Sequence, residues 1–249
     1  MTKFVVFTTP RTGSSLLIKT LDTHPEIFCA GELFFFKGDS YHAEYRYPFW
    51  RFPFSNKINY IINYPKIFFS LNSFLNQFYK ENSKTGIKSK GFKLMHFQTY
   101  YTPGILNYIR KNNIKVIVLI RKNILRNTLS DLRARSTKVY HNSGDTATVT
   151  IPMFKVDVHE LARKMRQIER FNKQLERSTV NLNRKIVYYE DFENWEATVS
   201  GILHYLSVTD IPLRPASRKL NPVKLEDMIE NYTEVSSWLL ENNYAQFLD

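Results

Sequence analysis

The stretch FVVFTTPRTGSSLL, residues 4–17, joins an apolar run to a turn rich in hydroxyl groups and then to an apolar segment with helical spacing. Residues 4–8 are predicted to form a buried strand, and residues 14–22 a helix. His24-Pro25 ends this helix, because proline disfavours helix in the residue before it. The chain therefore opens with a strand, a glycine-containing turn and a helix.

The turn itself has the composition of an anion-binding site. A helix that begins directly after a turn presents free backbone N–H groups and the positive end of its dipole. Gly13 allows close approach of the backbone, Thr12, Ser14 and Ser15 add hydroxyl groups, and Arg11 adds a delocalised cation. The alternative is an ordinary strand-to-helix turn capped by Ser14.

The turn departs from the loop of nucleoside triphosphatases, which reads GxxxxGK[ST] and places its last hydroxyl on magnesium. Here the spacing is shorter, arginine precedes the glycine and no lysine follows it. The buried strand near residue 120 ends in Arg121, where a magnesium-binding carboxylate would be expected, although Glu190 or Asp191 could supply one. A triphosphate ligand is therefore disfavoured and not excluded.

The rest of the chain alternates between strand and helix patterns. Extended segments are predicted at 27–34, 90–97, 115–121 and 185–189, and helices after Thr102-Pro103, at 123–135, from the capping pair Asp157/Glu160 and at 192–206. This alternation predicts an α/β protein: a P-loop-like, three-layer fold with a mostly parallel central sheet and helices on both faces. We expect a single domain, residues 1–249.

Two segments interrupt this pattern. Residues 34–80 form an aromatic-rich insert, in which prolines at 48, 53 and 65 argue against one long helix. The insert is either an acceptor-binding platform or lid, or simply core or a dimer surface. Residues 136–156 are polar and predicted to form a mobile loop.

Bulk composition narrows the class of protein. The chain has 249 residues and a net charge of +12, which favours an anionic partner: nucleic acid, anionic lipid or a polyanionic small molecule. The single cysteine, Cys29, excludes an internal disulfide and is expected to be a small buried residue. No signal peptide or transmembrane run is apparent, and nothing precedes the first strand, so we expect a cytoplasmic protein.

A second basic cluster follows the strand 115–121. Arg121 stands at the carboxyl end of that strand, where open α/β sheets bind ligands. Arg126, Ser130 and Arg133 then form one stripe at i, i+4 and i+7 of the next helix, which a solvated helix face would explain equally well. Two anion-competent sites on one sheet suit a ligand with two separated phosphate groups.

These residues together resemble a sulfotransferase that uses 3′-phosphoadenosine 5′-phosphosulfate (PAPS). PRTGSSLL resembles the loop for the 5′-phosphosulfate, and the pair Arg121 and Ser130 resembles the 3′-phosphate motif. The family pattern is also matched by Gly31-Glu32 soon after the first helix and by Tyr189-Glu190-Asp191 late in the chain. The resemblance is closest to bacterial carbohydrate sulfotransferases of the trehalose and lipopolysaccharide types, and it covers the sheet and the cofactor side.

The resemblance implies roles for individual residues. Arg11 would reach the bridging oxygen of the donor, where charge develops as the S–O bond breaks. Residues 12–15 (Thr12, Gly13, Ser14 and Ser15) would cradle the 5′-phosphate, Arg121 and Ser130 would grip the 3′-phosphate, and Arg218 or Lys219 would close over the donor. No metal is needed, and the six histidines lack the spacing of metal ligands.

The acceptor hydroxyl needs a general base, for which there are two candidates. Glu32 is the first, since the resembling bacterial enzymes use a glutamate at this position; otherwise it is a surface or ion-paired carboxylate. His96, at the end of the strand 90–97, is the rival, because histidine titrates near neutral pH. It is otherwise a structural histidine.

The favoured function is sulfuryl transfer to a hydroxyl of a carbohydrate or glycolipid. Two alternatives remain: a P-loop-type kinase, which would need magnesium and ATP, and a basic module that binds single-stranded nucleic acid. The nucleic-acid alternative ranks last, because no RNP-type signature is present. The acceptor cannot be identified from spacing, and a homodimer through the aromatic-rich region is a further expectation.

Overall fold

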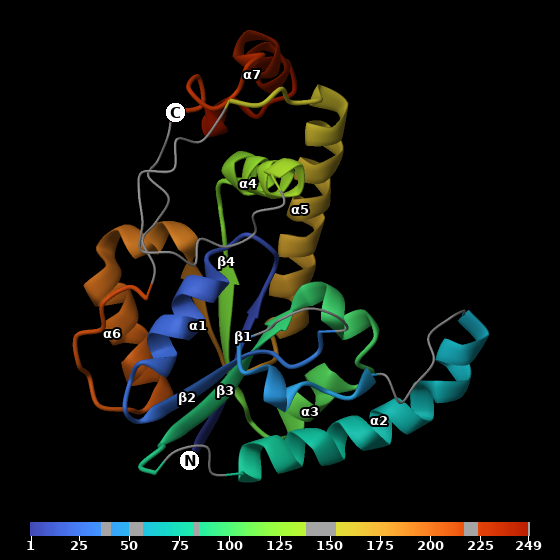
Figure 1. Ribbon diagram of the computed structural model, residues 1–249, viewed down its shortest axis with the longest axis vertical. Helices are drawn as coiled ribbons and strands as arrows, with labels where there is room; N and C mark the ends of the chain where they lie inside the picture. The colour runs from blue at the N-terminus through green and yellow to red at the C-terminus, as the bar shows by residue number, and fades with distance from the viewer. Residues whose placement is uncertain (36–40, 50–56, 82–84, 138–152, 217–223, 249) are drawn as a thin grey trace. The chain divides into compact units, whose positions relative to one another are not determined.

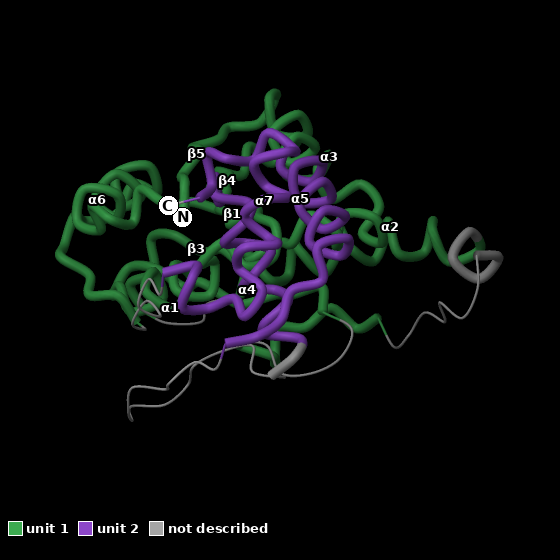
Figure 2. The backbone as a smooth tube through the Cα atoms, turned by 90° about the horizontal axis from the view of Figure 1, so that it is seen from above, with its two compact units in different colours: residues 1–120, 173–216 green, residues 121–172, 217–249 purple. Residues whose placement is uncertain are grey.

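The computed structural model describes residues 1–35, 41–49, 57–81, 85–137, 153–216 and 224–248. The chain forms two compact units, shown in different colours in Figure 2. Unit 1 comprises residues 1–120 and 173–216, and unit 2 comprises residues 121–172 and 217–249. The expectation of a single domain stays a prediction, and each unit is described by itself.

Unit 1 is built on a five-stranded sheet (Figure 1) in the order β2-β3-β1-β4-β5. The strands are β1 (Thr2–Thr8), β2 (Ile27–Glu32), β3 (Ser89–Met95), β4 (Lys115–Ile120) and β5 (Arg184–Tyr188). Every neighbouring pair is parallel. Strands β2 and β3 lie on one side of β1, and β4 and β5 lie on its other side. The direction in which the chain adds strands therefore reverses between β1 and β4. Ligands of open α/β sheets bind at the carboxyl ends beside such a reversal.

Helices cover both faces of this sheet. Alternate residues of β1 point to opposite faces: Phe4 and Val6 pack with α1 (Ser14–Asp22) and α6 (Trp195–Leu206), and Val5 and Phe7 pack on the other side. The second face carries α2 (Lys57–Lys80) and α3 (Ile105–Lys111). The three-layer α/β prediction is confirmed.

Unit 2 has its own apolar core. It contains α4 (Ile124–Thr137), residues 158–172 of α5 (Val158–Thr179) and α7 (Tyr232–Glu241). Leu125, Leu161 and Leu239, one from each helix, are fully buried in the same cluster. Helix α7 follows the last segment assigned in the sequence analysis and was not predicted.

Most predicted boundaries are confirmed to within a few residues, and α1 spans the predicted residues 14–22. Asp157 also caps α5 as predicted, since its Oδ1 accepts the backbone N–H groups of His159 and Glu160 at 2.8 and 3.0 Å. The start of α3 was predicted wrongly at Thr102-Pro103. The helix begins at Ile105 after Gly104, whose φ of +78° lets it act as the N-cap.

The aromatic-rich insert differs most from expectation. Residues 57–80 form one 24-residue helix with Pro65 inside it, so the argument from prolines was wrong for this part of the insert. Proline removes one backbone N–H and does not prevent a helix whose other contacts are strong. Phe34, Tyr47 and Phe49 are buried among themselves and the core, which confirms the core interpretation for these rings. Most of the predicted loop, residues 138–152, lies outside the described residues.

Two further observations concern the described part of the chain. None of its helices combines the length and the hydrophobicity needed to cross a membrane. No three histidine, cysteine or acidic side chains are grouped there in a way that could hold a metal ion.

Candidate active site

The loop after β1 has a backbone that only a few residue types adopt readily. Arg11 and Gly13 both have left-handed conformations, with φ of +63° and +78°. Hydroxyl groups brace the loop from inside: Thr8 Oγ1 donates to the Leu119 carbonyl at 2.8 Å and lies 2.6 Å from Thr12 Oγ1. Thr12 Oγ1 also donates to the Thr9 carbonyl at 3.1 Å. The loop is thereby fixed to the carboxyl end of β4.

The bracing changes the role available to Thr12. Thr12 is fully buried and its hydroxyl is bonded within the loop, so this hydroxyl holds the loop in shape. Gly13, and not Ser14, is the N-cap of α1, and no side chain bonds to the backbone at that cap. The first turn contains no acidic residue. Ser14 is therefore not the N-cap that the alternative expected, and anion binding at the start of α1 stays a prediction.

Tyr189 packs directly over this loop. A Cβ at Gly13 would lie 2.7 Å from Cδ2 of the Tyr189 ring, well inside van der Waals contact. Tyr189 begins the short helix η4 (Tyr189–Asn194), whose N-terminus is held by a hydrogen bond from the Tyr188 N–H to Asp191. The Tyr-Glu-Asp triplet is visible in the sequence, but the position of its first ring over the loop was not predicted.

Glu32, at the carboxyl end of β2, is bonded to side chains on and after β3. Its Oε1 pairs with Lys93 Nζ at 2.8 Å, and its Oε2 accepts a hydrogen bond from Gln98 Nε2, also at 2.8 Å. Gln98 is itself fixed, because its Oε1 accepts the Met95 N–H at 2.9 Å. Neither Lys93 nor Gln98 was predicted. A lysine inside the buried strand 90–97 was the available signal, since a buried cation requires a partner.

His96 follows β3 directly and is 5% exposed. Its ring lies among aromatic neighbours, with centroids 6.2 Å from Phe7 and 5.5 Å from Tyr100. Burial lowers the pKa of His96, so the imidazole is neutral near pH 7 and has the protonation state of a base. Its burial also limits its access to an acceptor.

The sheet register brings these groups to one edge. Thr8 is level with Met95 of β3 and with Leu119 of β4, so the loop after β1 starts beside the residues that follow β3 and β4. Glu32 is paired with Lys93 in the next ladder. The loop after β1, Glu32 and His96 therefore all lie at the carboxyl edge of the unit 1 sheet.

The second predicted cluster lies in unit 2. Arg121 precedes α4, and Ser130 lies on α4 with Arg126 and Arg133 on the same stripe, all four half-buried. Burial lowers the pKa of Arg133. A fully solvated helix face would leave these side chains exposed. Their partial burial does not fit that interpretation of the stripe. Asn123 caps the helix by accepting the Arg126 N–H at 2.9 Å.

Part of the predicted site is not described by the structure. Arg218 and Lys219 lie outside the described residues. Arg11 and Arg121 belong to different units, so a pocket formed by both clusters stays a prediction.

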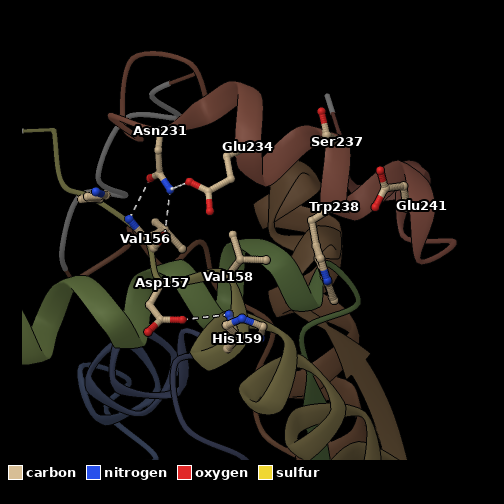
Figure 3. Close-up of a pocket in the computed structure, with 10 residues that line it drawn as sticks. Val156, Asp157, Val158, His159, Asn231, Glu234, Ser237, Trp238 and Glu241 are labelled. Carbon is tan, nitrogen blue, oxygen red and sulfur yellow. Dashed lines mark hydrogen bonds between the residues drawn. The ribbon is translucent and has the colours of Figure 1, made fainter.

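Unit 2 also contains a cavity of about 790 Å³ between the start of α5 and α7 (Figure 3). Asn231 is one of the lining residues: its amide accepts the Val156 N–H and donates to the Val156 carbonyl, both at 2.9 Å, and donates to Glu234 at 2.8 Å. None of the predicted site residues that the structure describes lines this cavity.

Cys29 is fully buried in β2, and burial raises the pKa of its thiol. A thiol that is both buried and protonated is a poor nucleophile. The interpretation of Cys29 as a small core residue is confirmed.

No protein-family model matches the chain, and no curated protein matches its sequence. Solved structures do match its fold. A sulfotransferase from Alicyclobacillus acidocaldarius aligns with a TM-score of 0.51 at 12% identity, covering 99% of this chain and 92% of that one. The sulfotransferase domain from the curacin biosynthetic pathway aligns with a TM-score of 0.52 at 15% identity, covering 100% and 90%. At these identities the similarity establishes a shared fold.

Proposed function

We propose that this protein is a PAPS-dependent sulfotransferase. The observation that carries the proposal is the loop between β1 and α1: residues 11 and 13 are left-handed, no side chain caps the start of α1, and its first turn has no acidic residue. This loop occurs on a fold shared with two sulfotransferases. Backbone N–H groups at such a helix start suit the phosphosulfate end of the donor.

Arg11 is proposed to stabilise the charge that develops during transfer. The acceptor oxygen attacks sulfur in line with the bridging oxygen, the S–O bond to that oxygen breaks, and the bisphosphate nucleotide leaves with the electron pair. A cation fixed beside the bridging oxygen stabilises the transition state more than the ground state. The left-handed φ of Arg11 sets the direction in which its side chain leaves the loop.

Glu32 is proposed as the general base that takes the proton of the acceptor hydroxyl. Lys93 and Gln98 fix its carboxylate at the edge where the loop lies. Its side chain is 16% exposed, so it is more accessible than His96. The proposed acceptor is a hydroxyl of a carbohydrate or glycolipid, which rests on the resemblance of the sequence motifs.

Arg121 and Ser130 are proposed to bind the 3′-phosphate. They are half-buried members of one stripe in unit 2, and Arg121 directly follows β4, whose carboxyl end is bonded to the loop through Thr8. A guanidinium group forms paired hydrogen bonds with phosphate oxygens, and a hydroxyl adds one more.

The decisive experiment is calorimetric titration with adenosine 3′,5′-bisphosphate, the spent donor, in the presence of a metal chelator. We expect binding that is weakened at least about tenfold in Arg121→Ala, because one charge-assisted phosphate contact is lost. Arg163→Ala is the matched control, since Arg163 is an exposed arginine of the same unit whose salt bridge with Glu160 lies on the helix surface.

Three outcomes would contradict the proposal. The protein could ignore the bisphosphate, or bind ATP only together with magnesium, which would favour the kinase alternative. Equal binding in Arg121→Ala and Arg163→Ala would also contradict it, because the affinity would then come from overall charge.

A second experiment separates the two candidate bases. Glu32→Gln keeps the size of the side chain and its bond with Gln98, so the bisphosphate should bind as before while sulfuryl transfer falls by about 10²–10⁴-fold. Transfer can be measured with PAPS and a panel of sugars and phenols. Unchanged turnover in Glu32→Gln, combined with loss in His96→Gln, would assign the base to His96.

A further inference from the structure

Helix α2 carries large apolar side chains on a side that unit 1 does not cover. Ile62 is 59% exposed, Tyr64 44% and Phe69 71%. Ile67 and Leu71, on the side that packs on the sheet, are fully buried. Figure 1 shows that the amino-terminal part of α2 extends past α3, which lies along its later part. The helix therefore packs on one side and exposes three large apolar side chains between Ile62 and Phe69.

Between Glu44 and Glu81, the charged residues of the sequence have one sign. Residues 45–80 contain no aspartate or glutamate, and their charged residues are Arg46, Arg51, Lys57, Lys66 and Lys80. Lys66 is exposed and stands between Ile62 and Phe69 at positions i, i+4 and i+7 of the helix. These three residues, called the Ile62–Phe69 stripe below, place a cation between two apolar side chains on one face.

We propose that the Ile62–Phe69 stripe docks the protein on the surface of a membrane that contains anionic lipids. An interfacial helix combines apolar side chains that enter the acyl boundary with lysines that stay at the headgroups. The lysine adds attraction to anionic headgroups, and the net charge of +12 adds to it. The helix would lie on the bilayer. This proposal does not depend on the proposed function.

Other partners fit the stripe less well. A two-fold contact with a second copy would bring each Lys66 near its equivalent, with no acidic residue between 45 and 80 to balance them. Nucleic acid would match the charge, but its backbone offers no hydrocarbon in which Ile62 and Phe69 could be buried. A membrane surface satisfies both the charge and the apolar side chains.

The test is co-sedimentation with vesicles of phosphatidylcholine, alone or mixed with phosphatidylglycerol. We expect binding to the mixed vesicles that weakens as salt is raised. Ile62→Ser and Phe69→Ser should each reduce partitioning by about tenfold or more, since each removes one large apolar side chain from the bilayer. Leu240→Ser is the matched control, because Leu240 is also 59% exposed but lies on α7.

A second readout locates the contact. Cys29 is fully buried, so a thiol-reactive, environment-sensitive dye will label a cysteine introduced at an exposed site. In Phe69→Cys the dye should shift to the blue when mixed vesicles are added, and in Leu240→Cys it should not. Both substitutions replace exposed side chains, so thermal unfolding should be unchanged.

The proposal is overturned if the protein does not bind the mixed vesicles. Binding that is equal in Phe69→Ser and Leu240→Ser would also overturn it, because the contact would then lie elsewhere. A dimer in solution that Phe69→Ser dissociates, without any vesicle binding, would assign the stripe to contact between copies.

Discussion

At the scale of single residues, Gly13 has two separate reasons to be glycine. Its φ of +78° is costly for any residue with a Cβ, and a Cβ would also meet the Tyr189 ring at 2.7 Å. We predict that Gly13→Ala lowers the free energy of unfolding by about 2–4 kcal/mol. Backbone strain at positive φ contributes about 1–2 kcal/mol of this, and the clash with the Tyr189 ring contributes the rest. Urea denaturation measures this change.

Gly86 provides the control for this prediction. Its φ is +82°, but a Cβ there would meet nothing within 4 Å, so Gly86→Ala should show only the backbone cost of about 1–2 kcal/mol. The double variant Gly13→Ala/Tyr189→Ala should be less destabilised than the sum of its single variants. Additive costs would mean that the ring does not restrict position 13.

The ion pair of Glu32 and Lys93 gives a second prediction at this scale. Both side chains are mostly buried, at 16% and 9% exposure, so Lys93→Met leaves a carboxylate without its cation. We expect a loss of about 3–5 kcal/mol in the free energy of unfolding, much of which the double variant Lys93→Met/Glu32→Gln should recover. A double-mutant cycle in urea measures the coupling. Independent effects would show that Lys93 does not hold Glu32.

At the scale of elements, Glu26 joins three segments of unit 1. Its carboxylate pairs with Lys88 before β3 and accepts the N–H of Thr209 after α6 at 2.8 Å. The hydrogen bond from Lys88, followed by that from Thr209, lowers the pKa of Glu26 from 4.5 to about 2. The Glu26 carboxylate thus binds a proton less readily in the folded state than in the unfolded state. Its contribution to the stability of the folded state is therefore fully present above about pH 4.5 and is lost as the pH falls to about 2.

We predict that Glu26→Gln reduces the acid dependence of stability in that interval. The urea midpoint of the wild type should fall more steeply than that of Glu26→Gln between pH 4.5 and the lowest pH at which the protein stays folded. Glu44→Gln is a suitable control, since its side chain is 63% exposed. Parallel curves for the wild type and Glu26→Gln would contradict the prediction.

The elements that the sequence predicted are those with strong local signals. The strands 115–121 and 4–8 are continuous apolar runs, and α1 is bounded by a glycine and by His24-Pro25. The predictions failed where packing dominates. Helix α2 continues through Pro65 because Ile67, Leu71 and later residues are buried against the sheet, which no local rule reveals.

The site shows the same division between local and long-range information. The loop between β1 and α1 could be located from the sequence because its residues are contiguous, from Arg11 to Ser15. The partners of Glu32 could not, since Lys93 and Gln98 are more than 60 residues away and meet it only through the parallel ladder. The ring over Gly13 likewise comes from Tyr189, which only the folded sheet brings near.

At the scale of the whole molecule, the proposed donor makes a prediction about both units. If one nucleotide binds residues 11–15 of unit 1 and Arg121 and Ser130 of unit 2, adding adenosine 3′,5′-bisphosphate should slow amide hydrogen exchange in both segments at once. At one hundred times its dissociation constant, the ligand should also stabilise the protein by about 2.7 kcal/mol.

Arg121→Ala provides the test of this coupling. It removes one contact in unit 2, yet it should reduce protection in residues 11–15 of unit 1 as well at the same concentration of bisphosphate, because a ligand held by both units loses affinity as a whole. Arg163→Ala, which changes an exposed arginine of unit 2, should leave both segments protected. If Arg121→Ala affects exchange only around α4, the two clusters bind separate anions and a single nucleotide does not span them.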